Sequence, residues 1–398
     1  MPKLYVGFIR NLRRVSRRNS GHLAMRILYA VENHSWEDMN LLEGLRQAGH
    51  DVLVHRPGHP FHEALSSEWS SADRARVSER LVEAAKRAHD RAPIDVMFGY
   101  FLKQLVYPEA IREISELGIL TMNYWCNGAH QFHLVDEISP AFDVCIATER
   151  AALPAYEAVG AHAVYLQMAA NPERYGPHDL PLEYDVTFVG QRYADRPEIV
   201  LHLLEQGVDI HVWGPGWTKD RSHGEKAIHF AHGPRAFIRH PRSTAQRTAR
   251  QLHDLLRARR AVPPRAERRL AAIAGPSLSY EDLVRMYSRS RISLGFSTTG
   301  NARYSDVAKI RQLHLRDFEA PMSGAAYFVE CQDELEEFYD IGREIECYGS
   351  REELAEKVKF YLTKPDALLA MRRAGYARAS RDHTWARRFE QLFAQVAT

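Results

Sequence analysis

The sequence predicts an α/β fold made of two domains, each built on a parallel sheet. The chain has 398 residues, a length that usually corresponds to two domains or to one large α/β unit. Short apolar runs alternate with helical patterns along it, which is typical of parallel sheets covered by helices on both faces. Residues 171–184 contain three prolines and no periodicity, so we expect a linker between the domains there.

The first domain is expected over residues 25–170, after a basic extension formed by residues 1–24. Gly49 and Gly118 are suited to end two of its helices, because glycine readily adopts the backbone conformation of a helix terminus. Its strands are predicted from apolar runs at 27–31, 51–55, 94–100, 119–125, 142–148 and 163–169. Helical segments lie between several of these runs, so we expect successive βα units.

The second domain is expected over residues 185–382, interrupted by an Arg-rich, helical insertion over 219–275. Its strands are predicted at 185–190, near 210, at 291–297 and at 325–329. Ser279 is expected to cap one helix, and Ser350 with Glu353 to form the capping box of another. A final helix over 383–398, capped by Thr384, completes the chain.

The composition fits a soluble globular protein, with 45% hydrophobic and 26% charged residues. No apolar run approaches the roughly 18 to 20 residues that span a membrane, and no secretory signal is visible. The four cysteines are widely spaced and form no CxxC pair. This spacing argues against a disulfide framework or a zinc knuckle and favours a reducing cytoplasm.

Two segments are strongly basic although the net charge is only +2. Residues 1–24 carry six basic side chains and no acid, and residues 235–269 carry eleven arginines against two acids. Such segments favour contact with nucleotide phosphates, a phospholipid surface or nucleic acid. The alternative for 235–269 is a solvated or subunit-contacting insertion, because its apolar positions are too few for a strong membrane anchor.

Several well-known catalytic and nucleotide-binding motifs are absent from the sequence. It contains no GxxxxGK[ST] phosphate loop, no GxGxxG after a strand, no HExxH and no GxSxG. No two aspartates are separated by a single residue, so the DxD pair that holds a metal–nucleotide complex in one large class of sugar transferases is missing.

Five motifs in the second half occur in an order that resembles a known family. They are "FVGQRYADR", "LSYEDLVRMYSRSRISLGFS", "RDFEAPMSGAAYFVE", "EIECYGSREELAEKVKFYL" and "GYARASRDHTWARRF". Together they resemble the C-terminal domain of GT-B glycosyltransferases of the CgeB-like type, over roughly residues 185–390. The first half is similar to the matching acceptor domain more loosely, through "NYWCNGAH", "FDVCIAT" and "AANPERY".

The resemblance implies a fold of two Rossmann-like domains that face each other across a cleft and bind a nucleotide-sugar there. It also implies that the last helix crosses back to the first domain, and that no metal or other cofactor takes part. Open α/β sheets bind ligands beyond the carboxyl ends of their strands, which agrees with this expectation.

The resemblance singles out Glu319 in "RDFEAPMSG", which stands between Arg316 and the turn expected at Pro321–Gly324. The matching glutamate of the family is expected to hold the ribose of the donor. The alternative is that Glu319 only caps a helix and pairs with Arg316. Many retaining GT-B enzymes carry a second glutamate eight positions earlier, where this chain has Arg311. That difference leaves the stereochemical outcome open.

Other donor-binding candidates follow the predicted strand ends of the second domain. A glycine there lets the backbone approach a ligand, and guanidinium groups bind phosphate oxygens bidentately. Without a metal, cationic side chains must stabilise the departing diphosphate. The candidates are Gly190, Arg192, Arg196, Arg316, Ser297 and Thr298, and the alternatives are solvated arginines and turn-capping hydroxyls.

The candidate catalytic residues lie in the first domain. "NYWCNGAHQFHLVDE" follows a strand and supplies His130, His133, Asp136 and Glu137. An inverting transferase needs a general base that deprotonates the acceptor hydroxyl, and a retaining enzyme needs polar contacts to the sugar. His130 is the first choice, with His133, Glu32 and His34 as further candidates; the alternative for each histidine is a structural role.

The sequence therefore predicts a cytoplasmic, metal-independent glycosyltransferase, with a peripheral position at the membrane as the alternative. The donor is expected to be a UDP-, TDP- or GDP-linked sugar, and the acceptor to lie near residues 123–137. The acceptor could be a glycan, protein, lipid or small molecule, with nucleic acid disfavoured. Two alternatives stay open, namely a sugar-nucleotide epimerase of the same fold and a non-catalytic protein that binds sugar-nucleotides or nucleic acid.

Overall fold

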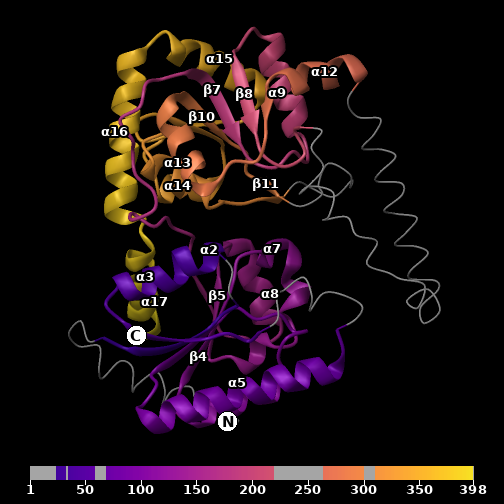
Figure 1. The fold of residues 1–398 in the computed structure, drawn as a ribbon, viewed down its shortest axis with the longest axis vertical. Coiled ribbons are helices and arrows are strands. Elements are labelled where there is room, and N and C mark those ends of the chain that lie inside the picture. The colour runs from indigo at the N-terminus through magenta and orange to yellow at the C-terminus, as the bar shows by residue number, and fades with distance from the viewer. Residues whose placement is uncertain (1–23, 33–34, 59–68, 219–262, 300–309, 398) are drawn as a thin grey trace, which may run out of the picture. The chain divides into compact units, whose positions relative to one another are not determined.

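The structure is a computed structural model that describes residues 24–32, 35–58, 69–218, 263–299 and 310–397 (Figure 1). The basic extension up to residue 23, His34 and residues 219–262 of the Arg-rich insertion lie outside the described residues. The chain divides into two compact units. Unit 1 comprises residues 1–171 and 384–398, and unit 2 comprises residues 172–383.

Unit 1 is built on a parallel sheet of six strands in the order β2-β1-β3-β4-β5-β6. The strands are β1 (Arg26–Ala30), β2 (Asp51–His55), β3 (Val96–Gly99), β4 (Leu120–Trp125), β5 (Val144–Ala147) and β6 (Ala163–Tyr165). Every residue of β3, β4 and β5 is buried, whereas the edge strand β2 is partly exposed. Central strands of a parallel sheet are covered on both faces, which explains their nearly continuous apolar sequence.

Helices connect these strands and cover the sheet. They are α2 (Ser35–Glu37), the π-helical η1 (Asp38–Leu42), α3 (Glu43–Gln47), α5 (Ser71–Arg91), α6 (Pro108–Glu116), α7 (Gly128–Gln131), α8 (Leu153–Ala158) and α17 (Trp385–Ala397), with 3-10 turns η2 (Phe132–Leu134), η3 (Ser139–Ala141) and η4 (Arg150–Ala152). The last helix, α17, packs against α3. A Cβ atom on Gly44 would collide with Cβ of Trp385, so a glycine permits this close helix contact.

Unit 2 repeats the architecture with a second parallel sheet, in the order β14-β13-β10-β7-β8-β9. Its strands are β7 (Tyr184–Val189), β8 (Ile210–Trp213), β9 (Ala274–Gly275), β10 (Ser290–Gly295), β13 (Tyr327–Glu330) and β14 (Glu346–Tyr348). A separate antiparallel pair joins β11 (Thr298–Thr299) to β12 (Ile310–Arg311). Its helices are α9 (Arg196–Glu205), α12 (Pro264–Ala272), α13 (Tyr280–Arg289), α14 (Arg316–Met322), α15 (Arg351–Leu362) and α16 (Pro365–Asp382), with the 3-10 helix η7 (Asp333–Glu337).

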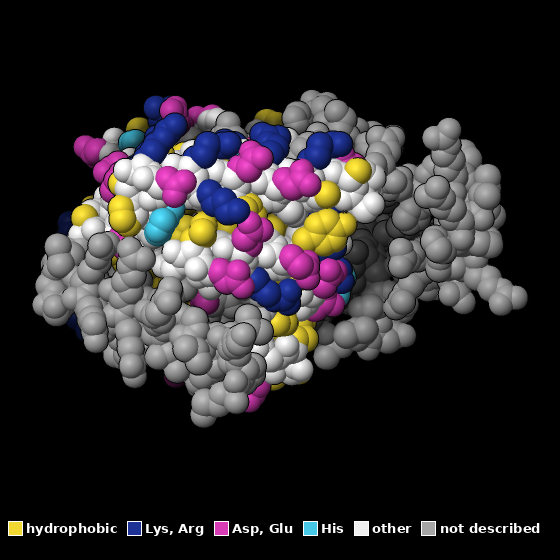
Figure 2. All heavy atoms as spheres, turned by 90° about the horizontal axis from the view of Figure 1, so that it is seen from below, with side chains coloured by type: hydrophobic (Ala, Val, Ile, Leu, Met, Phe, Trp, Pro, Cys, Tyr) yellow, Lys and Arg dark blue, Asp and Glu magenta, His cyan; other side chains and the backbone are white. Residues whose placement is uncertain are grey.

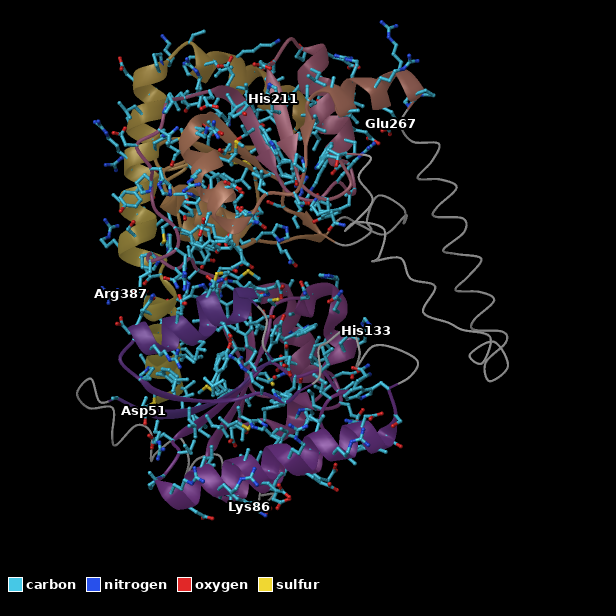
Figure 3. The ribbon with its side chains drawn as sticks, viewed as in Figure 1. Asp51, Lys86, His133, His211, Glu267 and Arg387 are labelled. Atoms are coloured by element: carbon cyan, nitrogen blue, oxygen red, sulfur yellow. A yellow bond between two sulfur atoms is a disulfide. The ribbon has the colours of Figure 1, made fainter. Side chains whose placement is uncertain are left out.

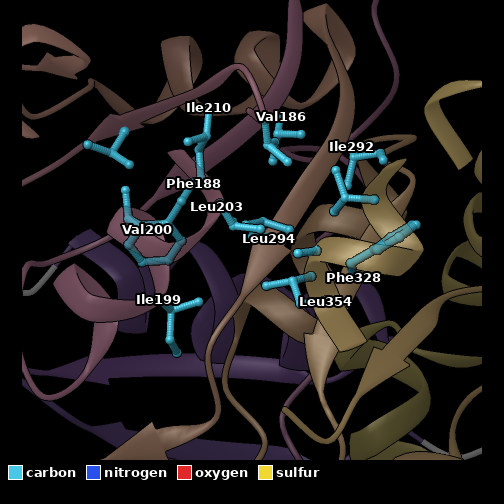
Figure 4. Packing of buried hydrophobic residues seen from close by; sticks show 14 of the residues in the cluster. Val186, Phe188, Ile199, Val200, Leu203, Ile210, Ile292, Leu294, Phe328 and Leu354 are labelled. Carbon is cyan, nitrogen blue, oxygen red and sulfur yellow. The ribbon is translucent and has the colours of Figure 1, made fainter. Parts of the chain in front are cut away.

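The core of unit 2 lies between the sheet and its helices (Figure 4). Val186, Val212 and Leu294 come from three neighbouring strands, and Leu203 and Leu354 reach them from α9 and α15. All five are buried. The core holds the strands in register, so the loops at their carboxyl ends start from a rigid sheet.

The predicted helix termini are largely confirmed. The Ser279 and Ser350 side chains accept hydrogen bonds from the third residues of their helices, and Thr384 accepts one from the amide of Arg387. The capping box at Ser350 is incomplete, because the Glu353 carboxylate accepts from the amide of Gly349 instead. Gly49 has a φ of 84°, the left-handed conformation expected after a helix.

Three boundaries differ from the sequence-based expectation. Asn171, placed in the linker, is fully buried in unit 1, where its side chain bonds to Gln47 and Glu43. Tyr184, also placed in the linker, begins β7. The Arg-rich insertion was predicted to extend to residue 275, but residues 274–275 pair with β8. Two-residue strands carry no periodicity, so the sequence could not reveal β9.

The cysteines also differ from the expectation. Cys331 and Cys347 form a disulfide, with Cα atoms 5.0 Å apart, although the spacing of the cysteines argued against disulfides. The two residues lie at neighbouring strands, since β13 pairs with β14 and the amide of Cys331 donates to the carbonyl of Tyr348. Sequence separation does not indicate which strands become neighbours. The inference of a reducing compartment from cysteine spacing therefore loses its basis.

The described surface of unit 1 mixes both charges. Figure 2 shows Lys and Arg side chains interspersed with Asp and Glu. Two ion pairs on this unit, Lys86 with Glu113 at 2.5 Å and Arg87 with Glu83 at 3.2 Å, illustrate the mixture. Among the described residues, no helix is long and apolar enough to cross a bilayer.

Candidate active site

The carboxyl ends of β7 and β8 in unit 2 are joined by a direct backbone contact. The amide of Gly190 donates to the carbonyl of Trp213 at 2.8 Å, and a Cβ on Gly214 would collide with the Gly190 carbonyl. Gly214 has a φ of 131°, which favours glycine. A Cβ on Gly190 would lie 2.6 Å from the ring of Phe188. The packing of these loops thus accounts for Gly190, which was expected to admit a ligand.

Arg196 begins helix α9 and is only 6% exposed. Its Nη atoms donate to the Gln191 carbonyl at 2.9 Å and to the Tyr193 hydroxyl at 2.8 Å. Its buried Nε atom has no hydrogen-bond partner in the described part of the chain. No carboxylate in that part forms an ion pair with it, and burial lowers the pKa of its guanidinium.

The position of Arg196 suits the binding of an anion. A buried guanidinium that no carboxylate contacts directly is costly, and such groups often occur at functional sites. The charge of Asp195 raises the pKa of Arg196 but does not outweigh the effect of burial. The ten-residue helix α9 presents its positive dipole end at the same point, although the amides of Arg196 and Glu198 already donate to the carbonyls of Tyr193 and Asp195. Ala194, two residues earlier, has a φ of 54°, which is uncommon for a residue other than glycine. Strain of this kind tends to occur where a functional loop must hold a fixed shape.

Arg192, the neighbouring candidate, is already paired. Its guanidinium contacts both carboxylate oxygens of Glu267 at 3.0 and 2.5 Å. Glu267 lies on α12 (Figure 3). It also lies 5.7 Å from the ring centroid of the buried Trp217. Because its charge is neutralised by Glu267, Arg192 is a weaker phosphate ligand than Arg196. The sequence could not distinguish the two arginines, since Glu267 is 75 residues away.

Ser297 and Thr298 follow β10 and use their hydroxyls within the protein. The Ser297 hydroxyl donates to the Glu330 carbonyl at 3.1 Å, and the Thr298 hydroxyl donates to the Glu330 carboxylate at 3.2 Å. Arg311 contacts the other oxygen of that carboxylate at 3.0 Å. Glu330 therefore organises this edge of the sheet, and neither hydroxyl is free to bind phosphate. Arg311, which replaces the glutamate of many retaining enzymes, has a structural counter-ion.

Glu319 lies inside helix α14 and is 1% exposed. One carboxylate oxygen accepts from the Tyr175 hydroxyl and the other from the Arg316 guanidinium. Burial raises the pKa of Glu319, an effect that Arg316 and the Tyr280 hydroxyl oppose. The geometry contains the Glu319–Arg316 pair of the structural alternative, and the ribose contact of Glu319 stays a prediction.

The expected turn at Pro321 is also displaced. Pro321 lies within α14, and the chain reverses only at Gly324, whose φ is 74°. A proline inside a helix usually kinks or ends it, and here α14 ends one residue later, at Met322.

Replacing Glu319 with alanine should lower the free energy of unfolding by about 1–3 kcal/mol, because the buried Tyr175 hydroxyl loses its acceptor. The Arg316 side chain is 39% exposed and can turn to solvent, which keeps the cost near this range. Urea unfolding measures the change. Glu319→Gln keeps an acceptor for Tyr175 and should lose less stability. An unchanged free energy of unfolding in Glu319→Ala would contradict the structural role.

In unit 1, most of the predicted catalytic side chains are engaged elsewhere. Asp136 pairs with Lys103 at 2.9 Å, and Glu137 pairs with Arg74 at 2.9 Å. Glu32 accepts from the amide of Gly58 at 2.6 Å. His34 lies outside the described residues. These carboxylates hold loops and strands together and are poor candidates for proton transfer.

The two predicted histidines differ in environment. His133 is exposed on the 3-10 turn η2 (Figure 3). His130 is half-buried in α7, and its buried Nδ1 atom has no hydrogen-bond partner in the described part of the chain. Burial and the neighbouring His133 lower the pKa of His130, so its imidazole is neutral at pH 7. His130 can therefore still accept a proton, as expected of a general base, whereas His133 is a solvated side chain.

The structure brings forward Glu37, which was not among the candidates. It ends α2, the first helix after β1, and is 3% exposed. Its Oε2 atom is buried and has no hydrogen-bond partner among the described residues. Burial, with a smaller contribution from the charge of Asp38, raises the pKa of Glu37 from 4.5 to about 7. The sequence could have indicated Glu37 as an acidic residue that follows a predicted strand. Glu32 and His34 were chosen instead because they lie nearer to the end of that strand.

Glu37 should make the stability of unit 1 depend on pH. Its folded pKa lies above its unfolded value, so its contribution is fully present below pH 4.5 and is lost as pH rises to about 7. A shift of this size corresponds to about 3 kcal/mol. Replacing Glu37 with glutamine should therefore stabilise the protein at pH 8 relative to wild type. Urea unfolding at pH 4.5, 6 and 8 measures this difference. If the free energy of unfolding changes with pH equally in wild type and in Glu37→Gln, Glu37 does not titrate in this range.

Among the described residues, no group of three or more His, Cys, Asp or Glu side chains is arranged to hold a metal ion.

Comparisons with known proteins relate the chain to enzymes that transfer sugars. A family model described as glycosyl transferase-like matches residues 247–394. No curated protein matches the sequence. Among solved structures, a sucrose-phosphate synthase from Thermosynechococcus elongatus is 13% identical with a TM-score of 0.54, and the match covers 94% of this chain and 99% of that one.

Two further structures are similar over nearly their whole length. HepE of Anabaena, solved in complex with UDP and glucose, is 12% identical with a TM-score of 0.58, covering 94% of this chain and 99% of that one. A glycosyltransferase from Rickettsia africae is 11% identical with a TM-score of 0.58, covering 94% and 98%. The two parallel sheets and these neighbours confirm the predicted GT-B fold. The family match confirms the predicted enzyme class, a glycosyltransferase.

Proposed function

We propose that this glycosyltransferase uses a nucleoside-diphosphate sugar as donor and holds its diphosphate at Arg196. The observation that carries the proposal is the buried Arg196 guanidinium, which lacks a carboxylate partner at the start of α9. A diphosphate would supply the missing negative charge. The position, after the first strand of unit 2, is one where open α/β sheets bind ligands.

The reaction would break the bond between the anomeric carbon of the sugar and the diphosphate oxygen. An acceptor oxygen would form the new bond to that carbon. Negative charge then develops on the departing diphosphate, and a cation fixed in place beforehand stabilises it without reorganisation. Arg196 is held by Gln191 and Tyr193, and its guanidinium carbon lies 3.8 Å from the Tyr193 ring centroid. It is therefore suited to this role, and we propose that no metal takes part.

The donor base and the subtype belong to the same proposal. HepE has been solved with UDP and glucose and with UDP-glucose, which makes UDP-sugars the first donors to test. The CgeB-like subtype rests on the order of the sequence motifs. A ribose contact by Glu319 stays a prediction of the resemblance, and its carboxylate already accepts hydrogen bonds from Tyr175 and Arg316. For location we propose the cytoplasm; the buried free thiols of Cys126 and Cys145 fit it, but the disulfide does not.

A thermal-shift screen with UDP, TDP, GDP and their glucose conjugates tests donor binding. A ligand at about 100 times its dissociation constant stabilises a protein by about 2.7 kcal/mol. We expect at least one nucleotide to raise the melting temperature in the presence of EDTA. If no nucleotide or nucleotide-sugar raises it, the proposed function is wrong. If stabilisation appears only when a divalent metal is added, metal independence is wrong.

A further inference from the structure

One pair of cysteines in unit 2 is placed to respond to thiol reagents. Cys331 directly follows β13, Cys347 lies within β14, and both residues of this disulfide are partly exposed. The other two cysteines, Cys126 and Cys145, are buried free thiols, and burial raises the pKa of each to about 12. Because only an accessible thiolate takes part in disulfide exchange, these two thiols are inert. The Cys331–Cys347 pair is therefore the one that can change its redox state.

The disulfide fixes the end of β13, where Glu330 is the last residue. Glu330 pairs with Tyr348 of β14 in the sheet, and the amide of Cys331 donates to the Tyr348 carbonyl at 2.8 Å. The Tyr348 hydroxyl donates in turn to the carbonyl of Gly295, the last residue of β10, at 2.7 Å. Because β14 is an edge strand of only three residues, few backbone hydrogen bonds hold it. The disulfide is therefore the strongest tie between β14 and the strand that carries Glu330.

Three consecutive hydrogen bonds lead from Glu330 to the proposed diphosphate ligand, Arg196. The Thr298 hydroxyl donates to the Glu330 carboxylate at 3.2 Å, and the Tyr193 hydroxyl donates to the Thr298 carbonyl at 3.2 Å. Arg196 donates to the Tyr193 hydroxyl at 2.8 Å. Glu330, Thr298 and Arg196 are at most 6% exposed, so water cannot readily replace these bonds if one partner moves. We call Glu330, Thr298, Tyr193 and Arg196 the Glu330 chain.

Resting on the proposed function, we propose that the Cys331–Cys347 disulfide is a redox switch that sets the affinity of the Arg196 site for nucleoside diphosphates. With the disulfide formed, the strand end that carries Glu330 is fixed, and the Glu330 chain holds the Arg196 guanidinium in place before the ligand arrives. With two free thiols, the end of β13 has more freedom, and ordering the Glu330 chain on binding reduces the binding free energy. The oxidised protein therefore binds its donor more tightly than the reduced protein.

The switch operates by thiol–disulfide exchange with a dithiol. The bond between the two Sγ atoms breaks, two electrons and two protons pass from the dithiol to Cys331 and Cys347, and the dithiol closes to a cyclic disulfide. Exchange with an oxidised dithiol reverses these steps, so atoms and electrons balance in both directions. A disulfide that opens and closes is compatible with a reducing compartment, where a permanent disulfide is rare. The proposed cytoplasmic location and the disulfide are then no longer in conflict.

Calorimetric titration of the full-length protein with UDP, TDP and GDP tests the switch. The protein is equilibrated with reduced or oxidised dithiothreitol at constant pH, and its accessible thiols are counted. We expect two more accessible thiols in the reduced form, and about three- to tenfold weaker binding of the tightest nucleotide. Equal affinity in both forms, or a cysteine pair that never changes state, overturns the inference while the proposed function stands. If none of the three nucleotides binds the oxidised protein, the proposed function fails, and the inference fails with it.

A variant that combines Cys331→Ser and Cys347→Ser shows whether this pair carries the response. It should bind the tightest nucleotide with the affinity of reduced wild type, and dithiothreitol should not change that affinity. Cys145→Ala is the matched control, because it removes a buried thiol of β5 in unit 1, which donates to the Ser139 carbonyl. This control should keep the full redox response of wild type. A double serine variant that still responds, or that binds as tightly as oxidised wild type, would refute the role of the disulfide.

Thr298→Val tests the Glu330 chain, because valine keeps the shape of threonine and removes the hydroxyl that reaches Glu330. The oxidised variant should bind the nucleotide as weakly as reduced wild type, and reduction should weaken its binding less than twofold further. Thr187→Val is the matched control, since its buried hydroxyl donates to Ser290 at 2.8 Å. It should lower the melting temperature and leave the redox response intact. If Thr298→Val keeps the affinity of wild type, or keeps the full redox response, the Glu330 chain does not transmit the switch and the inference is overturned.

Discussion

Replacing Arg196 with glutamine should lower the rate of sugar transfer by about 10² to 10³, the usual cost of removing one preorganised donor to a developing negative charge. The same variant should lose most of the thermal stabilisation by nucleoside diphosphates. Its melting temperature without nucleotide should fall only modestly, because no direct ion pair is broken, although the Gln191 carbonyl and the Tyr193 hydroxyl each lose a donor. Steady-state kinetics with the best donor of the screen and thermal shifts measure both effects.

Two further variants make the Arg196 experiment specific. Arg196→Lys keeps the positive charge but cannot form the bidentate hydrogen bonds of a guanidinium. It should therefore recover only part of the activity that Arg196→Gln loses. Arg192→Gln is the matched control four residues away, where the arginine is bound by Glu267. It should retain nucleotide binding within a few-fold. If Arg192→Gln loses nucleotide binding and Arg196→Gln keeps it, the assignment of the diphosphate contact is wrong.

Trp385→Ala should destabilise unit 1 by about 3–5 kcal/mol, the usual cost of emptying a large buried site. Trp385 begins α17 and is fully buried, with its ring centroid 6.2 Å from that of Tyr124 and 6.0 Å from that of Phe389. Its indole nitrogen donates to Asn40 at 2.9 Å, so the variant also leaves a buried amide without that partner. The lost hydrogen bond therefore affects the segment around Asn40, which also contains Glu37.

Calorimetry measures this effect, since the two units need not unfold in one transition. A transition assigned to unit 1 should move down by on the order of 10 °C in Trp385→Ala. Trp385→Phe keeps an aromatic ring and loses only the hydrogen bond, so it should cost less. A loss below 1 kcal/mol in Trp385→Ala would show that α17 contributes little to unit 1.

The sequence was most informative where burial is complete. The central strands β3, β4, β5 and β10 were predicted because both faces of a parallel sheet are covered and leave a nearly continuous apolar run. Short or irregular elements gave no such signal. The two-residue strands β9, β11 and β12 contain too few residues for any periodicity. The π-helical turn η1 looks like ordinary helix in sequence.

The candidate site was predicted in kind but not in detail. Arg196 was identified from its place after a strand, yet so was Arg192, and only the fold pairs the latter with Glu267. The partner of Glu319, Tyr175, lies 144 residues earlier in the chain. Long-range pairs of this kind depend on tertiary packing, which pattern and spacing do not encode. Glu37 was missed because its raised pKa results from burial, and burial of a single carboxyl is not visible in sequence.

The central claim is that this chain transfers a sugar from a nucleotide donor. A time course followed by proton and phosphorus NMR tests it most directly, with the best donor of the screen, methyl glucoside and EDTA. We predict that nucleoside diphosphate accumulates, that the sugar appears on the acceptor or on water, and that Arg196→Gln slows both at least 100-fold. Conversion of the donor sugar without release of nucleoside diphosphate would indicate an epimerase. A donor that binds but stays intact would indicate a binding protein, and either result would contradict the account.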